Sequence, residues 1–110
     1  MIIFTRAYDF LSWLLPATNH FPKAHRFSFT QRLLGAAFEM YENLVEAQQQ
    51  HGKARKAASK HASMQLDKVR LYLRLAQRWQ WLSEGQYHHV ASMVTEIGRL
   101  LGGWQRATRG

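Results

Sequence analysis

Apolar side chains recur at intervals of three and four residues along four stretches of the chain, as amphipathic helices require. The first stretch runs from about Phe4 to Leu15, and Pro16 should end or kink it there. The second covers about Phe29 to Gln50, the third Lys53 to Trp81, and the fourth Tyr87 to Leu101. Short connections between such helices predict one all-α domain over residues 1–110, an antiparallel four-helix bundle.

Local signals mark where these helices should begin and end. Ser28–Gln31 and Ser83–Gln86 both match a capping box, in which the serine and glutamine side chains satisfy free backbone N–H groups. The residues Asn19–Phe27 should form a loop. Gly102-Gly103 should end the fourth helix, leaving Trp104 to fold back onto the bundle or to meet another subunit.

Gly98 lies inside the fourth predicted helix, where glycine costs about 1 kcal/mol relative to alanine. Close approach of a neighbouring helix would compensate for that cost. The first turns of the third helix, Lys53–Ser63, hold little apolar bulk and should project beyond the core or fray.

The chain is strongly basic, with a formal net charge of +8 and an isoelectric point near 10.5. Residues 53–78 carry eight Lys or Arg against one Asp, hence +7, whereas residues 1–29 carry +2, residues 30–52 carry −2 and residues 79–110 carry +1. Such an excess favours an acidic partner, either nucleic acid or an anionic membrane surface.

Six basic side chains of the third helix fall within a sector of about 100°, at about 100° per residue. They extend over about 38 Å of the helix axis, enough to follow a nucleic-acid backbone. A solvated charged surface is the alternative interpretation, but only Asp67 interrupts the row, and like charges repel when no counter-charge is bound. A membrane surface is disfavoured because the core needs the apolar faces. The six residues are Lys53, Lys56, Lys60, Arg70, Arg74 and Arg78.

The loop before the second helix is a second candidate for binding, because it interleaves cations with aromatic rings. Aromatic side chains beside cations can stack on unpaired bases. Alternatively, Phe27 and Phe29 plug the end of the bundle. The four tryptophans are expected in the core or in a subunit interface. The loop residues are Phe21, Lys23, His25, Arg26, Phe27 and Phe29, and the tryptophans are Trp13, Trp79, Trp81 and Trp104.

Catalytic and metal-binding signatures are missing from the sequence. Cysteine is absent, no two of the six histidines are four residues apart, and no Glu-x-x-His motif, phosphate-binding glycine loop or nucleophile elbow occurs. Glu39, Glu42 and Glu46 share one side of the second helix and should be solvated or paired with basic residues of another helix. We therefore expect a protein that is not an enzyme and binds no metal or cofactor. Because the sequence shows no signal peptide and no apolar run of membrane-spanning length, we expect a cytoplasmic location.

Several short motifs follow one another in a distinctive order: Trp13–Pro16, Phe21–Phe27, Gln31-Arg32, Leu71–Ala76, Leu82–Tyr87 and Glu96–Trp104. Together they resemble the accessory variability determinant (Avd) proteins of bacterial and phage diversity-generating retroelements, over nearly the whole chain.

The resemblance implies a four-helix bundle that assembles into a barrel-like homopentamer with a basic surface. Such a protein binds the element's reverse transcriptase and its RNA or DNA, has no enzymatic activity, and is required for mutagenic copying of a template repeat into a variable repeat of a target gene. By matching positions, the basic residues within the family's motifs are Lys23, Arg26, Arg32, Arg74 and Arg99, whereas the role of Lys53–Lys60 rests on charge alone.

Two other functions remain open. The related four-helix proteins encoded in intervening sequences of bacterial large-subunit ribosomal RNA genes share the expected fold and assembly. The segments Leu101–Trp104 and Phe21–Lys23 favour Avd over them. The third hypothesis is a structural adaptor whose basic surface docks an acidic protein.

Overall fold

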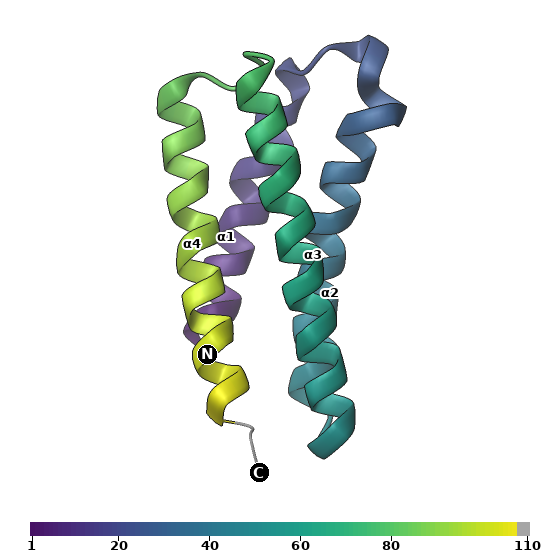
Figure 1. Ribbon diagram of the computed structural model, residues 1–110, viewed down its shortest axis with the longest axis vertical. Coiled ribbons are helices and arrows are strands. Elements are labelled where there is room, and N and C mark those ends of the chain that lie inside the picture. Colours follow the sequence, from purple (N-terminus) through teal and green to yellow (C-terminus); the bar gives the residue numbers. More distant parts are fainter. Residues whose placement is uncertain (108–110) are drawn as a thin grey trace.

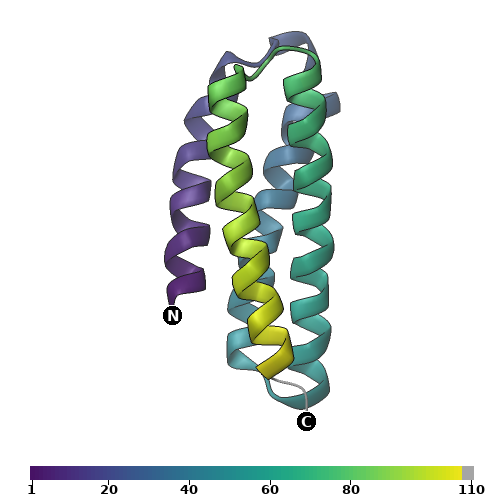
Figure 2. The same cartoon turned by 60° about the vertical axis from the view of Figure 1, so that its left-hand side comes forward.

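The computed structural model describes residues 1–107, and four long helices make up most of them. They are α1 (Ile2–Ala17), α2 (Gln31–Gln49), α3 (Gly52–Arg78) and α4 (Glu84–Ala107). Successive helices run in opposite directions and pack side by side into a rod of 45 × 25 × 19 Å (Figure 1; Figure 2). The predicted all-α antiparallel four-helix bundle is confirmed.

Each helix buries one stripe of residues spaced by three and four, and the four stripes form one core. Leucine, methionine and phenylalanine fill most of it, and alanines of α2 and α3 let these two helices pack more extensively than any other pair. None of these helices is long and apolar enough to cross a membrane, considering residues 1–107. The largest fully buried side chains include Phe10, Leu14, Leu33, Met40, Leu44, Leu66, Leu73, Ile97 and Leu101.

The connection between α1 and α2 is more helical than predicted. Pro16 lies in the last turn of α1, which ends one residue later, and two 3₁₀ turns (Thr18–His20 and Lys23–His25) and one π turn (Arg26–Thr30) lead into α2. Only Phe21 and Pro22 of the predicted loop Asn19–Phe27 lie outside these turns, so the loop prediction is wrong for the rest of that stretch. The capping box at Ser28 is also wrong, because Ser28 is already inside a helical turn, whereas a capping residue needs a non-helical backbone.

The start of α4 follows the prediction. The Ser83 backbone N–H donates to Gln86 Oε1 at 2.9 Å, and the Gln86 N–H donates to Ser83 Oγ at 3.1 Å. These reciprocal bonds are those of a capping box. Serine therefore caps the helix here, where the preceding backbone is not helical.

The end of α4 was predicted too early. Gly102 and Gly103 keep a helical backbone, and neither has the positive φ with which a glycine usually ends a helix. Trp104 stays in the helix and packs edge-on against Phe4 of α1, with ring centroids 6.4 Å apart. The guanidinium of Arg55 lies 5.5 Å from the centre of the Trp104 ring. These contacts favour continuation of the helix.

The bundle divides across its long axis into two halves. The connector half, residues 10–38 and 68–95, contains the α1–α2 connection and the α3–α4 turn. The terminal half, residues 1–9, 39–67 and 96–107, contains the N-terminus and the α2–α3 turn (Figure 1).

Candidate nucleic-acid interface

In the folded protein the positive excess does not follow residues 53–78 alone but accumulates at one end of the bundle. The connector half carries seven Lys or Arg and a single carboxylate, Glu84. The terminal half also carries seven Lys or Arg, but six Asp or Glu offset them. Because antiparallel packing brings residues 10–38 beside residues 68–95, the positive excess accumulates in the connector half. Its basic residues are Lys23, Arg26, Arg32, Lys68, Arg70, Arg74 and Arg78.

The predicted basic row on α3 is interrupted in its middle. Arg70 Nη1 donates to Asp67 Oδ1 at 2.6 Å, and the side chain of Arg70 is only 38% exposed. Its guanidinium lies against Gly98 of α4, so closely that a Cβ at that position would collide with it. The close approach of a neighbouring helix expected at Gly98 is confirmed. The side chain that approaches is that of Arg70, which the sequence had placed in the ligand-binding row.

The row therefore forms two separate groups. Arg74 and Arg78 are exposed in the connector half, whereas Lys53, Lys56 and Lys60 are exposed in the terminal half. The first turns of α3, where these lysines lie, are helical, and Ala58 and Ser59 among them are buried. This stretch packs against the bundle and neither projects beyond the core nor frays as predicted.

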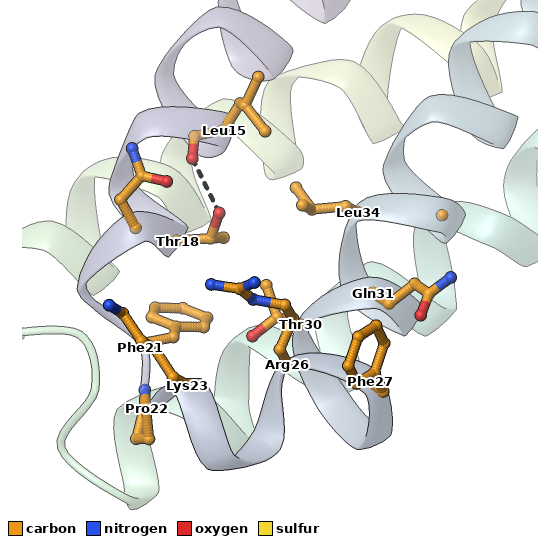
Figure 3. Close-up of a pocket in the computed structure, with 12 residues that line it drawn as sticks. Leu15, Thr18, Phe21, Pro22, Lys23, Arg26, Phe27, Thr30, Gln31 and Leu34 are labelled. Carbon is orange, nitrogen blue, oxygen red and sulfur yellow. Dashed lines mark hydrogen bonds between the residues drawn. The ribbon is translucent and has the colours of Figure 1, made fainter.

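Lys23 and Arg26 line the rim of a pocket of about 480 Å³ between α1 and α2 (Figure 3). Arg26 reaches over the pocket toward Thr18, whose hydroxyl donates to the Leu15 carbonyl at 2.8 Å. Phe27 lies on the opposite side and is 78% exposed, so it does not plug the bundle as predicted. Phe29, only 7% exposed, does so.

The two remaining candidates, Arg32 and Arg99, lie apart from the row on α3. Arg32 is exposed in the first turn of α2. Arg99 lies on α4 and donates through two nitrogens to Glu96, at 2.6 and 3.1 Å. The hydrogen bonds from Arg99 lower the pKa of Glu96, and Glu96 in turn raises the pKa of Arg99. The charge of Arg99 is thus offset locally.

The acidic side chains of α2 lie on the surface of the bundle. Glu39, Glu42 and Glu46 are exposed, and none forms an ion pair with another residue of the described chain. Within residues 1–107, no group of three or more His, Asp or Glu could hold a metal ion. The prominent chemistry of the surface is therefore its distribution of cations and aromatic rings.

Comparison with known proteins identifies the family. A family model described as bAvd-like matches residues 1–108. The chain belongs to the bAvd-like family. The resemblance to Avd proteins is thereby confirmed.

A solved structure shares the fold of this bAvd-like chain. It is a protein of unknown function from the S23 ribosomal protein family of Bacteroides thetaiotaomicron, 17% identical, with a TM-score of 0.85 and 96% of each chain covered. At this identity the likeness shows the fold alone. No curated protein matches the chain in sequence.

Two features of the bAvd-like chain escaped the sequence analysis. Arg55 donates to the Ala47 and Gln48 carbonyls at 2.9 and 3.1 Å and so satisfies the end of α2. His25 stacks on Trp81, with ring centroids 5.4 Å apart and planes 19° from parallel. Helical periodicity gives no signal for either contact, since each joins two elements.

Proposed function

We propose that this bAvd-like protein is a non-enzymatic accessory protein of a diversity-generating retroelement. In this role it binds the element's reverse transcriptase and RNA or DNA and is needed for mutagenic retrohoming. The observation that carries the proposal is the connector half, with seven Lys or Arg and one carboxylate. Clustered cations release counterions when they neutralise phosphates, which favours binding to nucleic acid. Membership of the bAvd-like family supports the reverse-transcriptase complex as the setting.

The connector half supplies the proposed phosphate contacts. Lys23, Arg26, Arg32, Arg74 and Arg78 are exposed there, and none of them forms an ion pair with a described residue. Lys53, Lys56 and Lys60 form a second, weaker group, because the carboxylates of the terminal half reduce the local potential. Arg70 and Arg99 contribute least, since Asp67 and Glu96 engage them.

We also propose assembly into a barrel-like homopentamer. A closed ring with an odd number of subunits needs two different, complementary surfaces on each subunit. Two groups of exposed apolar side chains support this. Tyr8 and Leu15 lie seven residues apart on α1, and Met64 and Leu71 lie seven residues apart on α3. Light scattering should give five times the 12.9 kDa chain mass, and Leu71→Glu should lower it. A monomeric wild-type protein would overturn this proposal.

Binding to RNA should be measured against salt for two matched variants of α3. Arg74→Glu/Arg78→Glu changes the connector half, and Lys53→Glu/Lys56→Glu makes the same charge change in the terminal half. We expect the first variant to lose more affinity, with the log–log salt slope falling by about 0.7 for each lost contact to a single strand. Equal losses would refute the assignment to the connector half, and the absence of salt-dependent binding in the wild type would refute the function.

The position of the gene separates the alternatives. A reverse-transcriptase gene and a pair of near-identical repeats beside it are expected for the retroelement. A position within a ribosomal RNA gene would indicate instead the related intervening-sequence proteins. Co-purification of the neighbouring reverse transcriptase with this protein, retained after nuclease treatment, tests the protein contact directly.

A further inference from the structure

A second pocket, of about 490 Å³, opens at the connector half, where the C-terminal end of α3 meets the turns before α2. We call it the indole pocket. Its volume is within the usual range for sites that bind small molecules, about 300–1,000 Å³. Two segments more than 45 residues apart in the sequence build it, so neither segment alone reveals it. It is lined by His25, Ser28, Phe29, Trp79 and Trp81.

The rings of the indole pocket hold one another in fixed orientations. Phe29 packs nearly perpendicular to Trp79 and Trp81, with ring centroids 5.5 and 5.2 Å away, and the centroids of the two indoles are 5.0 Å apart. His25 covers Trp81 by stacking. Trp79 nevertheless remains 47% exposed. The pocket therefore contains a large flat ring, oriented by its neighbours and open to solvent.

The backbone between the two indoles adopts an unfavourable conformation. Gln80 has a φ of +65°, and no other non-glycine residue among residues 1–107 has a positive φ. The Gln80 N–H donates to the Gln77 carbonyl at 3.0 Å, and the Trp81 N–H donates to the Ala76 carbonyl at 2.8 Å. This is the Schellman ending of a helix, in which glycine usually occupies the position of Gln80. Such a strained residue persists where the surrounding structure enforces it, often at binding sites.

Both segments that build the indole pocket carry cations close by in the sequence. Lys23 lies two residues before His25, Arg26 directly follows it, and Arg78 directly precedes Trp79. All three are exposed, and no carboxylate occurs in residues 10–38 or 68–83. An exposed ring on segments that carry cations and no carboxylate suits a ligand that is both planar and anionic. It suits an acidic peptide less well, since carboxylates alone would leave the indole uncovered.

We propose that the indole pocket binds an unpaired nucleobase of single-stranded RNA or DNA, stacked on Trp79, with the adjoining phosphate on Arg78 and phosphates further along the strand on Lys23 and Arg26. This inference rests on the proposed function in nucleic-acid binding and specifies the form of the ligand. Bases within a duplex are already stacked on one another, so only an unpaired base can reach the ring. Gln80, through its backbone conformation, acts as a positioning residue for Trp79 and Trp81.

The test compares a labelled twelve-nucleotide oligouridine with a twelve-base-pair RNA duplex, by fluorescence anisotropy at low salt. We expect Trp79→Ala to weaken binding to the single strand by about 5- to 150-fold and to leave duplex binding and the salt slope unchanged. Trp79→Phe should retain most of the affinity. His61→Ala, which removes an exposed aromatic ring of α3 in the terminal half, is the matched control and should bind as the wild type does.

A direct reading of the contact comes from tryptophan fluorescence. Oligouridine should quench the wild-type protein more than Trp79→Phe, because stacking on the indole causes the quenching. If salt-dependent binding persists but Trp79→Ala binds the single strand as tightly as the wild type, the inference fails and the proposed function stands. A loss of binding accompanied by a changed oligomeric mass in Trp79→Ala would show instead that Trp79 serves contacts between copies, and would overturn the inference. If the wild type binds neither nucleic acid, both proposals fail.

Discussion

The connector half and the terminal half of the bundle share all four helices but are built from different side chains. Aromatic rings close the connector half, and its surface is nearly free of carboxylates. In the terminal half, buried alanines such as Ala47 and Ala62 hold α2 and α3 together, and acidic residues balance the basic ones. A half that binds an anion must keep its cations unpaired, whereas a half that only supports the bundle gains from neutral charge and close packing.

The loss of one aromatic side chain should affect the connector half most. Phe29→Ala removes a buried ring that contacts the rings of Phe21, Tyr72, Trp79 and Trp81, and we expect it to lower the free energy of unfolding by about 3–5 kcal/mol. Phe27→Ala removes an exposed ring two residues away and should change it by less than about 0.5 kcal/mol. Urea unfolding followed by circular dichroism, at one protein concentration, measures both. Equal losses would mean that Phe29 does not close the bundle.

Overpacking should instead affect the terminal half. Ala62 is completely buried, so Ala62→Leu adds volume to a filled core and should cost about 1–3 kcal/mol in the free energy of unfolding. Ala57→Leu places the same side chain on the exposed side of α3 and serves as the control. The same urea titration applies. If both variants were equally stable, the core beside Ala62 would have unfilled space, contrary to the structure.

Substituting the serines of the two predicted capping boxes should have different effects, because only Ser83 caps a helix in the structure. Ser83→Ala removes the hydroxyl that accepts from the Gln86 N–H and should cost about 1 kcal/mol. Ser28→Ala alters the same motif where no cap forms, and a change below about 0.5 kcal/mol is expected. Thermal unfolding of the two variants, side by side, gives the comparison. A larger loss for Ser28→Ala would contradict the π turn before α2.

The smallest differences should come from two helical glycines. Gly35 in the connector half has open space around it, so Gly35→Ala should raise the free energy of unfolding by about 0.5–1 kcal/mol. Gly98→Ala should gain the same helix propensity, but the guanidinium of Arg70 must then move, which disturbs its hydrogen bond to Asp67 and lowers the free energy of unfolding. We expect a smaller gain or none, measured by the same unfolding titration. Equal stabilisation would show that Arg70 is held only loosely against α4.

The number, order and antiparallel arrangement of the helices could be predicted from sequence, because the spacing of apolar residues and the Ser83–Gln86 capping box act within one element. Helix ends that depend on other elements were predicted less well. Gly102-Gly103 looks like a stop, yet the packing of Trp104 against Phe4 carries α4 further. Ser28 matches the pattern of a helix cap, yet its backbone is already helical. The next residue, Phe29, is buried against Tyr72 of α3 and Trp81 of the α3–α4 turn.

The sequence by itself determined the fold class, the net charge and the absence of cysteine chemistry, since these depend on composition and on periodicity within each helix. Only the tertiary structure decided where the charge accumulates. The segment 53–78 holds most of the excess, but it spans the whole bundle, so its two ends meet different neighbours. Lys53 shares its half with the carboxylates of α2, whereas Arg78 shares its half with Lys23 and Arg26. Antiparallel packing pairs residues far apart in the chain, and that pairing places cations and aromatic rings on one surface.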